Sequence, residues 1–241
     1  MAEYHPRKVV IVGGSLAGLF TGIVFVRLGY NVTILERTPA AVLQDQGAGI
    51  SLYIILSSIR ESLEKLGTSG SPAADFLEQY DRTKTPTLIS DSLHYLNRDG
   101  SIRLKREKSG GTSRIASWDL LYNILRANFD GGYEEGYIDA AEKREGDGIA
   151  KYLSGVRVTD LKEVGNVLKV EYESTGGTGR MDADIVVGAD GPSSTVRKLL
   201  LSDVERTYAG YVAWRGTVKE SFLSEETKSR LGSNVRFGLR R

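Results

Sequence analysis

In the first forty residues the apolar positions are spaced first as in a strand, then as in a helix, and then again as in a strand. Residues 9–12 form a β-branched run without polar interruption, which is typical of a parallel strand buried on both faces. Residues 15–28 are apolar and compatible with a helix that ends at Gly29, and residues 32–35 form a second strand-like run. Strand, tight turn, helix and strand therefore follow one another, which predicts a βαβ unit.

Later segments indicate further strands of a different kind. Polar and apolar residues alternate at 156–158, 167–172 and 211–218, as in half-buried strands. Residues 183–187 form another buried run, and residues 92–96 and 102–104 flank a turn sequence that predicts a β-hairpin. Helices are expected at 57–66, 117–128 and 194–201. The pattern predicts an α/β protein.

One segment, residues 130–148, has no periodicity at all. It is acidic and rich in glycine, so we expect a poorly ordered surface insertion there.

Composition excludes several classes of function. The chain is 40% hydrophobic and 26% charged with a net charge of +1, so it offers no field that would gather nucleic acid or an anionic membrane. Cysteine is absent and histidine occurs twice, which excludes disulfides, thiolate chemistry and a His-rich metal site. No apolar run is long enough to cross a bilayer, so we expect a cytoplasmic protein. We expect no bound metal, because cysteine is absent and histidine is scarce.

The turn after the first predicted strand carries a recognisable glycine pattern. Residues 13–18 form G-x-S-x-x-G, the dinucleotide fingerprint with serine at its second glycine position. Gly13 permits the tight turn, Gly18 lets the helix pack on the strand, and Ser15 is small enough to approach a phosphate and keeps a donor. The helix N-terminus adds free N–H groups and a positive dipole end. The residues expected to contact a pyrophosphate are Gly13, Gly14, Ser15, Leu16, Ala17 and Gly18.

A carboxylate at the end of the second predicted strand extends this pattern. Glu36 has the spacing of a residue that accepts hydrogen bonds from a ribose diol, and it disfavours a 2′-phosphate there although Arg37 stands beside it. The alternative is a generic α/β turn followed by a surface glutamate. This motif does not separate FAD from NAD, so an NAD-dependent dehydrogenase is a second possibility.

A second glycine turn brings the sequence close to a known family. Residues 184–197 resemble the D-G-x-x-S-x-x-R element of the class A flavoprotein monooxygenases, the p-hydroxybenzoate hydroxylase-like family. The resemblance implies that Asp190 lies against the ribityl and pyrophosphate part of FAD and that Gly191 allows close backbone approach. It also implies that Arg197 braces the loop or helps at the nicotinamide donor. From the residues alone, a strand–turn–helix with an Asp/Ser cap is the alternative.

Further stretches resemble the pyridine-hydroxylating branch of this family. Residues 206–216 are similar to its Y-x-G-Y-x-x-W-R-G strand, which implies that Tyr211 and Arg215 line the substrate pocket, although aromatic sheet packing is equally open for Tyr211. Gly49 lies in a G-x-G-I stretch that in the family passes near the flavin. Arg114 is a candidate substitute for an FAD-contacting arginine that many relatives carry where Ser117 stands.

The resemblance implies an activity and a division into domains. The cofactor would be FAD, with NAD(P)H and O₂ as co-substrates and a small aromatic or pyridine-like ring as the substrate hydroxylated. Residues 1–205 would form a Rossmann-like FAD-binding domain, and the hairpin at 88–108 would contribute to a second, mainly antiparallel β substrate domain. Residues 206–241 would be the start of that substrate domain, which is incomplete. The family's later G-D-A-x-x-x-x-P segment does not occur, so we expect a truncated chain, and a non-catalytic FAD-binding remnant is the alternative.

Overall fold

The computed structural model places most of the chain in two compact units. The described residues are 7–40, 49–51, 88–90, 92–97, 99, 101–107, 113–132, 142–212, 218–231 and 235–238. Unit 1 comprises residues 1–46 and 121–212, and unit 2 comprises residues 47–120 and 213–241. The helix expected at 57–66 lies outside the described residues.

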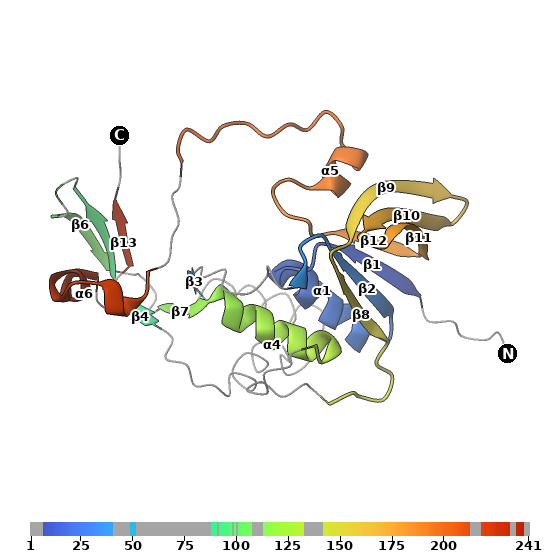
Figure 1. Cartoon of the computed structure of the whole chain (residues 1–241), viewed down its shortest axis with the longest axis horizontal. Helices are drawn as coiled ribbons and strands as arrows, with labels where there is room; N and C mark the ends of the chain where they lie inside the picture. Colours follow the sequence, from blue (N-terminus) through green and yellow to red (C-terminus); the bar gives the residue numbers. More distant parts are fainter. Residues whose placement is uncertain are drawn as a thin grey trace. The chain divides into compact units, whose positions relative to one another are not determined.

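A parallel sheet of four strands forms the centre of unit 1, in the order β12-β1-β2-β8. The strands are β1 (Lys8–Val12), β2 (Asn31–Glu36), β8 (Ala150–Ser154) and β12 (Ile185–Gly188). Helix α1 (Leu16–Arg27) connects β1 to β2, which pair in parallel as a βαβ unit requires (Figure 1). The predicted βαβ start and the Rossmann-like fold class are confirmed.

Helix α1 ends in a Schellman motif centred on the predicted stop residue. Gly29 has φ +85°, a left-handed conformation that glycine adopts without a steric penalty. Its N–H donates to the Val26 carbonyl at 3.0 Å, and the Tyr30 N–H donates to the Phe25 carbonyl at 3.0 Å. The Tyr30 and Phe25 rings also meet edge to face with centroids 5.3 Å apart. These bonds satisfy the last carbonyls of the helix and direct the chain into β2.

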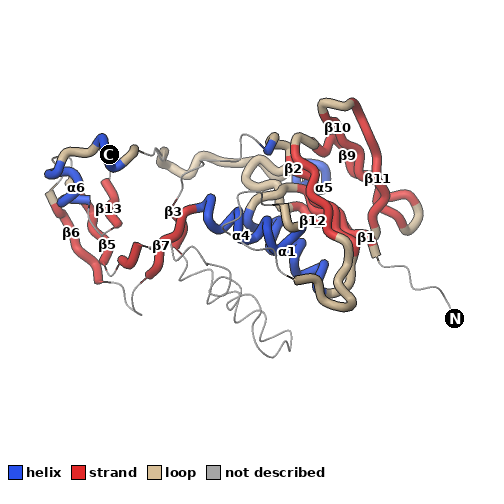
Figure 2. The backbone as a smooth tube through the Cα atoms, turned by 60° about the horizontal axis from the view of Figure 1, so that its bottom comes forward, coloured by secondary structure: helices blue, strands red, loops and turns tan. Residues whose placement is uncertain are grey.

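Two helices cover one face of the parallel sheet. Helix α4 (Trp118–Asp130) lies beside α1, as both views of the backbone show (Figures 1 and 2). The contact is close, since a Cβ on Gly22 of α1 would lie 2.7 Å from the ring of Phe129 and 3.1 Å from Ile34. The helix expected at 117–128 is therefore confirmed, with its apolar side buried.

An antiparallel sheet covers the opposite face. It consists of β9 (Arg157–Val164), β10 (Val167–Ser174) and β11 (Gly177–Ala183), in the order β11-β10-β9. The buried side chains between the two sheets are Val10, Val12, Leu35, Val156, Val158, Val170, Ala183 and Val196. Alternate residues of β1 thus face opposite layers, which explains why this strand is apolar throughout.

Part of the acidic segment is more regular than the sequence indicates. Residues 142–149 are held by specific bonds, since Asp147 pairs with Arg27 at the end of α1 and accepts from the Arg144 N–H at 2.8 Å. The Gly148 N–H donates to the Val26 carbonyl at 2.9 Å. The expectation of poor order is therefore wrong for residues 142–148, because Asp147 and Gly148 bond to residues more than a hundred positions earlier. Residues 133–141 of this segment lie outside the described residues.

Unit 2 contains two small sheets. One has the order β13-β5-β6 and the other β3-β7-β4. Their strands are β3 (Gly49–Ser51), β4 (Leu88–Ser90), β5 (Ser92–Leu96), β6 (Ile102–Glu107), β7 (Ser113–Ser117) and β13 (Val235–Gly238). A 3-10 turn, Glu220–Phe222, and helix α6 (Glu225–Leu231) lie between residues 218 and 231. Strands β5 and β6 pair antiparallel, which confirms the predicted hairpin.

Within the described part of the chain, no helix has the length and apolar character needed to cross a membrane.

Candidate dinucleotide-binding site

The glycine turn after β1 is shaped by contacts with other parts of the protein. Gly13 has φ +103°, and its N–H donates to the Leu35 carbonyl of β2 at 2.8 Å. A Cβ on Gly13 would lie 2.4 Å from the Ala189 carbonyl oxygen, and a Cβ on Gly18 would lie 1.9 Å from the Gly13 carbonyl oxygen. Both glycines are therefore required by the turn itself, as the fingerprint predicts.

The two glycine turns predicted from the sequence lie against each other. Strands β1 and β12 are neighbours with Val12 opposite Gly188, and the Ala189 N–H donates to the Val12 carbonyl at 2.7 Å. The carboxyl ends of neighbouring parallel strands are the usual ligand-binding edge of such a sheet. Residues 13–18 and 188–191 are thus brought to one edge from positions about 175 residues apart in the sequence.

The start of α1 presents backbone donors at this edge that make no bond within the helix. Ser15 is the N-cap residue, it is exposed, and its hydroxyl makes no capping bond within the described part of the chain. The first turn has no acidic side chain, and the first N–H groups of a helix have no partner inside it. Leu16 is half-buried and Ala17 is exposed. A positive dipole end, free donors and an exposed serine suit an anionic group such as a diphosphate.

Glu36 lies beside these donors but already serves the turn. It ends β2 and is only 8% exposed. One carboxylate oxygen accepts from the Gly14 N–H at 2.7 Å, and the other accepts from the Thr38 N–H at 2.8 Å. Each carboxylate oxygen has a further lone pair, so a ribose hydroxyl could still donate to it. Arg37 follows and is exposed.

Asp190 is engaged by the helix that follows it. Its Oδ1 accepts from the Ser194 hydroxyl at 2.5 Å, and its Oδ2 accepts from the Thr195 and Val196 N–H groups at 2.5 and 3.2 Å. These bonds cap helix α5 (Thr195–Leu200), so the structure contains the Asp/Ser cap that the sequence left as the alternative. Gly191 precedes the helix in the exposed part of this turn.

The loop at 188–194 is also braced from its other side. The Arg197 guanidinium donates to the Pro192 carbonyl at 2.5 Å, and its N–H donates to the Ser194 hydroxyl at 2.9 Å. A bracing contact for this arginine was one expectation from the resemblance. The turn is therefore stabilised by the chain's own groups.

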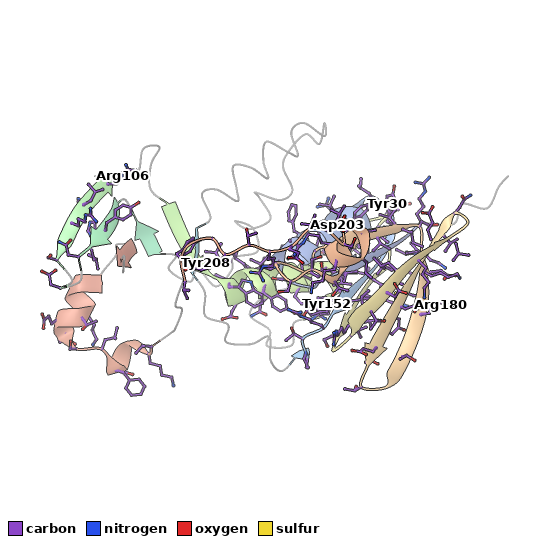
Figure 3. All side chains as sticks on the ribbon, turned by 90° about the horizontal axis from the view of Figure 1, so that it is seen from above. Tyr30, Arg106, Tyr152, Arg180, Asp203 and Tyr208 are labelled. Atoms are coloured by element: carbon purple, nitrogen blue, oxygen red, sulfur yellow. The ribbon has the colours of Figure 1, made fainter. Side chains whose placement is uncertain are left out.

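The sequence did not identify Tyr152, which contacts the first glycine turn from β8 (labelled in Figure 3). Its hydroxyl donates to the Gly14 carbonyl at 3.0 Å and accepts from the Tyr122 hydroxyl at 3.2 Å. Burial, more than any other effect, raises the pKa of Tyr152 well above its usual value, so the hydroxyl stays protonated. The local sequence gives no signal for this contact, because β8 is short and follows the acidic segment. The pairing of β8 with β2 brings Tyr152 to the site.

The remaining predicted residues do not belong to these two turns of unit 1. Gly49 and Arg114 belong to unit 2, in the paired strands β3 and β7. Tyr211 is 72% exposed in a segment without regular structure. The strand expected at 211–218 is therefore wrong for residues 211, 212 and 218, and residues 213–217 lie outside the described residues. Arg215 lies outside the described residues. No group of three or more potential metal ligands occurs among the side chains that the structure describes.

The sequence of the chain is similar to those of several known enzymes. No family model matches the sequence. The chain is 26% identical over 235 residues to 2,6-dihydroxypyridine 3-monooxygenase of Paenarthrobacter nicotinovorans, across 96% of this chain and 48% of that protein. It is 27% identical over 238 residues to aurachin C monooxygenase/isomerase of Stigmatella aurantiaca, across 96% and 53%. The chain is similar to FAD-dependent aromatic monooxygenases over nearly its whole length.

The fold is also similar to that of a solved structure. The structure of 2,6-dihydroxypyridine-3-hydroxylase from Arthrobacter nicotinovorans matches with a TM-score of 0.63 and 24% identity, over 98% of this chain and 50% of that one. The chain spans about half the length of the curated relatives it matches. The family resemblance inferred from the sequence motifs is confirmed.

Proposed function

We propose that this chain binds FAD through its ADP part at the carboxyl edge of the parallel sheet, as part of a flavin-dependent aromatic hydroxylase. The observation that supports this most directly is the meeting of two turns. Gly13 and Ala189 are in contact, so the start of α1 and the 188–191 loop border one edge. That edge is the usual ligand position in an open α/β sheet.

The residues present fit a dinucleotide without rearrangement of the turn. Free N–H groups and the Ser15 hydroxyl at the start of α1 would hold the diphosphate, because they are donors at a positive helix end. Glu36 would accept from the ribose with the lone pairs that its bonds to Gly14 and Thr38 leave unused. The backbone of Gly191, which carries no side chain, would permit the approach of the rest of the ligand.

The proposed reaction assigns a limited task to the protein. When bound, FAD supplies the redox chemistry by accepting hydride from NAD(P)H and, once reduced, activating O₂ for hydroxylation of an aromatic or pyridine-like ring. The described residues orient the dinucleotide and provide no nucleophile. Tyr211, Arg215, Gly49 and Arg114 stay candidates for contacts with the substrate or the flavin ring.

A panel of ligands tests the proposal on the purified chain. We expect quenching of flavin fluorescence on titration with FAD, competition by ADP, and no binding of FMN, because FMN lacks the adenosine half that this edge is built to hold. NAD⁺ should bind more weakly than FAD. Absence of FAD binding, or tighter binding of NAD⁺ than of FAD, would contradict the proposal.

Turnover is a separate measurement. Substrate-dependent oxidation of NAD(P)H by the FAD-loaded chain, with a panel of hydroxypyridines and hydroxybenzoates, would support hydroxylation. Binding of FAD without any such oxidation would support the FAD-binding part of the proposal and contradict catalysis by this chain.

A further inference from the structure

Gly14 is held by side chains at both of its polar groups. Its N–H donates to the Glu36 carboxylate at 2.7 Å, and its carbonyl accepts from the Tyr152 hydroxyl at 3.0 Å. Gly14 is buried and stands between the turn residue Gly13 and the N-cap residue Ser15. Rotation of either peptide group that flanks Gly14 would therefore break one bond in a buried setting, which is costly.

Tyr152 is itself held by side chains of α4. The Arg126 guanidinium carbon lies 3.7 Å from the centroid of the Tyr152 ring, which is the geometry of a cation–π contact. Arg126 makes two bonds to Asp130, each 2.9 Å long, so the guanidinium is held in turn by α4. The Tyr122 hydroxyl donates to the Tyr152 hydroxyl at 3.2 Å. The tyrosine hydroxyl is thus directed at one acceptor by groups from α4.

The close approach of Tyr152 also explains the glycine at position 14. A Cβ at this position would lie 2.2 Å from the Tyr152 hydroxyl oxygen. Position 14 is a variable position in the dinucleotide fingerprint, so the fingerprint does not require glycine there. In this chain the pairing of Gly14 with Tyr152 accounts for it.

We propose that Tyr152 is a positioning residue for the diphosphate of the bound dinucleotide. By holding the Gly14 carbonyl, it fixes the orientation of the peptide groups that follow at the start of α1 and that donate to the phosphates. This inference rests on the proposed binding of FAD at the same edge. It assigns to β8 a role in ligand binding in addition to its role as the edge strand of the sheet.

Tyr152→Phe tests the role, because it removes the hydroxyl and keeps the ring beneath Arg126. We expect the Kd for FAD to rise about 3- to 10-fold, since one hydrogen bond contributes roughly 0.5–1.5 kcal/mol. The Kd for ADP should rise by the same factor, and binding of adenosine, which has no phosphate, should not change. Tyr172→Phe on β10 is the matched control and should leave all three values unchanged.

The contrast between ADP and adenosine separates positioning from a general structural role. If Tyr152→Phe raises the Kd for ADP and the Kd for adenosine by the same factor, or changes neither, the proposal is overturned. If Tyr152→Phe does not fold, Tyr122→Phe replaces it, because it removes the group that orients the Tyr152 hydroxyl. We then expect the Kd for FAD and the Kd for ADP to rise about 2-fold while the Kd for adenosine stays the same. No change in the Kd for FAD and ADP would overturn the proposal. If the unaltered chain binds neither FAD nor ADP, the proposed function itself fails.

Discussion

Replacing Ser15 by aspartate should change stability and ligand affinity in opposite directions. Ser15 is the exposed N-cap of α1, and its hydroxyl makes no capping bond to the described residues. Aspartate is as favourable as serine at an N-cap and adds a negative charge at the positive end of the helix. We expect Ser15→Asp to raise the free energy of unfolding of the ligand-free protein by about 0.3–1 kcal/mol.

The same charge should oppose a diphosphate. Two unit charges about 4 Å apart repel by about 1 kcal/mol in water and about 4 kcal/mol at the effective dielectric constant of a protein surface. Since 1.4 kcal/mol is about a tenfold change in affinity, the Kd for FAD should rise by roughly 5- to 1000-fold. The increase should shrink as salt is added, because the site is exposed and screening acts on it.

Urea unfolding without ligand and quenching of flavin fluorescence measure the two effects. Ser15→Asn is the matched control, because asparagine caps as well as aspartate and carries no charge. The asparagine variant should keep the affinity for FAD within about 3-fold. If Ser15→Asp is folded and binds FAD as tightly as the unaltered chain, the phosphates do not lie at the start of α1.

Three further substitutions test the turn and its support. Asp190→Ala removes three bonds that cap α5 and should lower the free energy of unfolding by about 1–3 kcal/mol even without ligand, so an unchanged urea midpoint would contradict the capping role. Gly18→Ala places a methyl group 1.9 Å from the Gly13 carbonyl oxygen and should cost about 1–3 kcal/mol and weaken FAD binding; full retention of both would show that the turn tolerates a wider approach. Phe129→Ala removes a ring that is 4% exposed and packs on Gly22, so thermal unfolding should show that the free energy of unfolding falls by about 3–5 kcal/mol. The Kd for FAD of the folded fraction should not change.

The elements that the sequence predicts well are those specified by local chemistry. The run at 9–12, the helix ending at Gly29 and the hairpin around residue 99 each depend on neighbours within a few positions. A Schellman motif needs only a glycine in the left-handed conformation and the residues beside it. These features follow from the amino acids themselves, before any distant contact forms.

The parts that the sequence misses depend on partners far away in the chain. Strand β8 is short and lacks clear alternation, and it becomes a strand through its pairing with β2. The composition of residues 130–148 predicts a poorly ordered surface insertion, yet Asp147 in this segment pairs with Arg27 of α1. Tyr152 belongs to the same class, because nothing near it in the sequence indicates contact with Gly14.

The geometry also limits what the glycine motif alone can establish about a ligand. Gly13 is required by the Ala189 carbonyl, Gly14 by the Tyr152 hydroxyl, and Gly18 by the Gly13 carbonyl. These are contacts within the protein, so the glycines would be needed even if nothing were bound. What points to a dinucleotide is instead the set of donors that the turn leaves free at the start of α1, together with the second turn beside it. Experiments that alter charge or donor orientation, rather than glycine substitutions, therefore test ligand binding most directly.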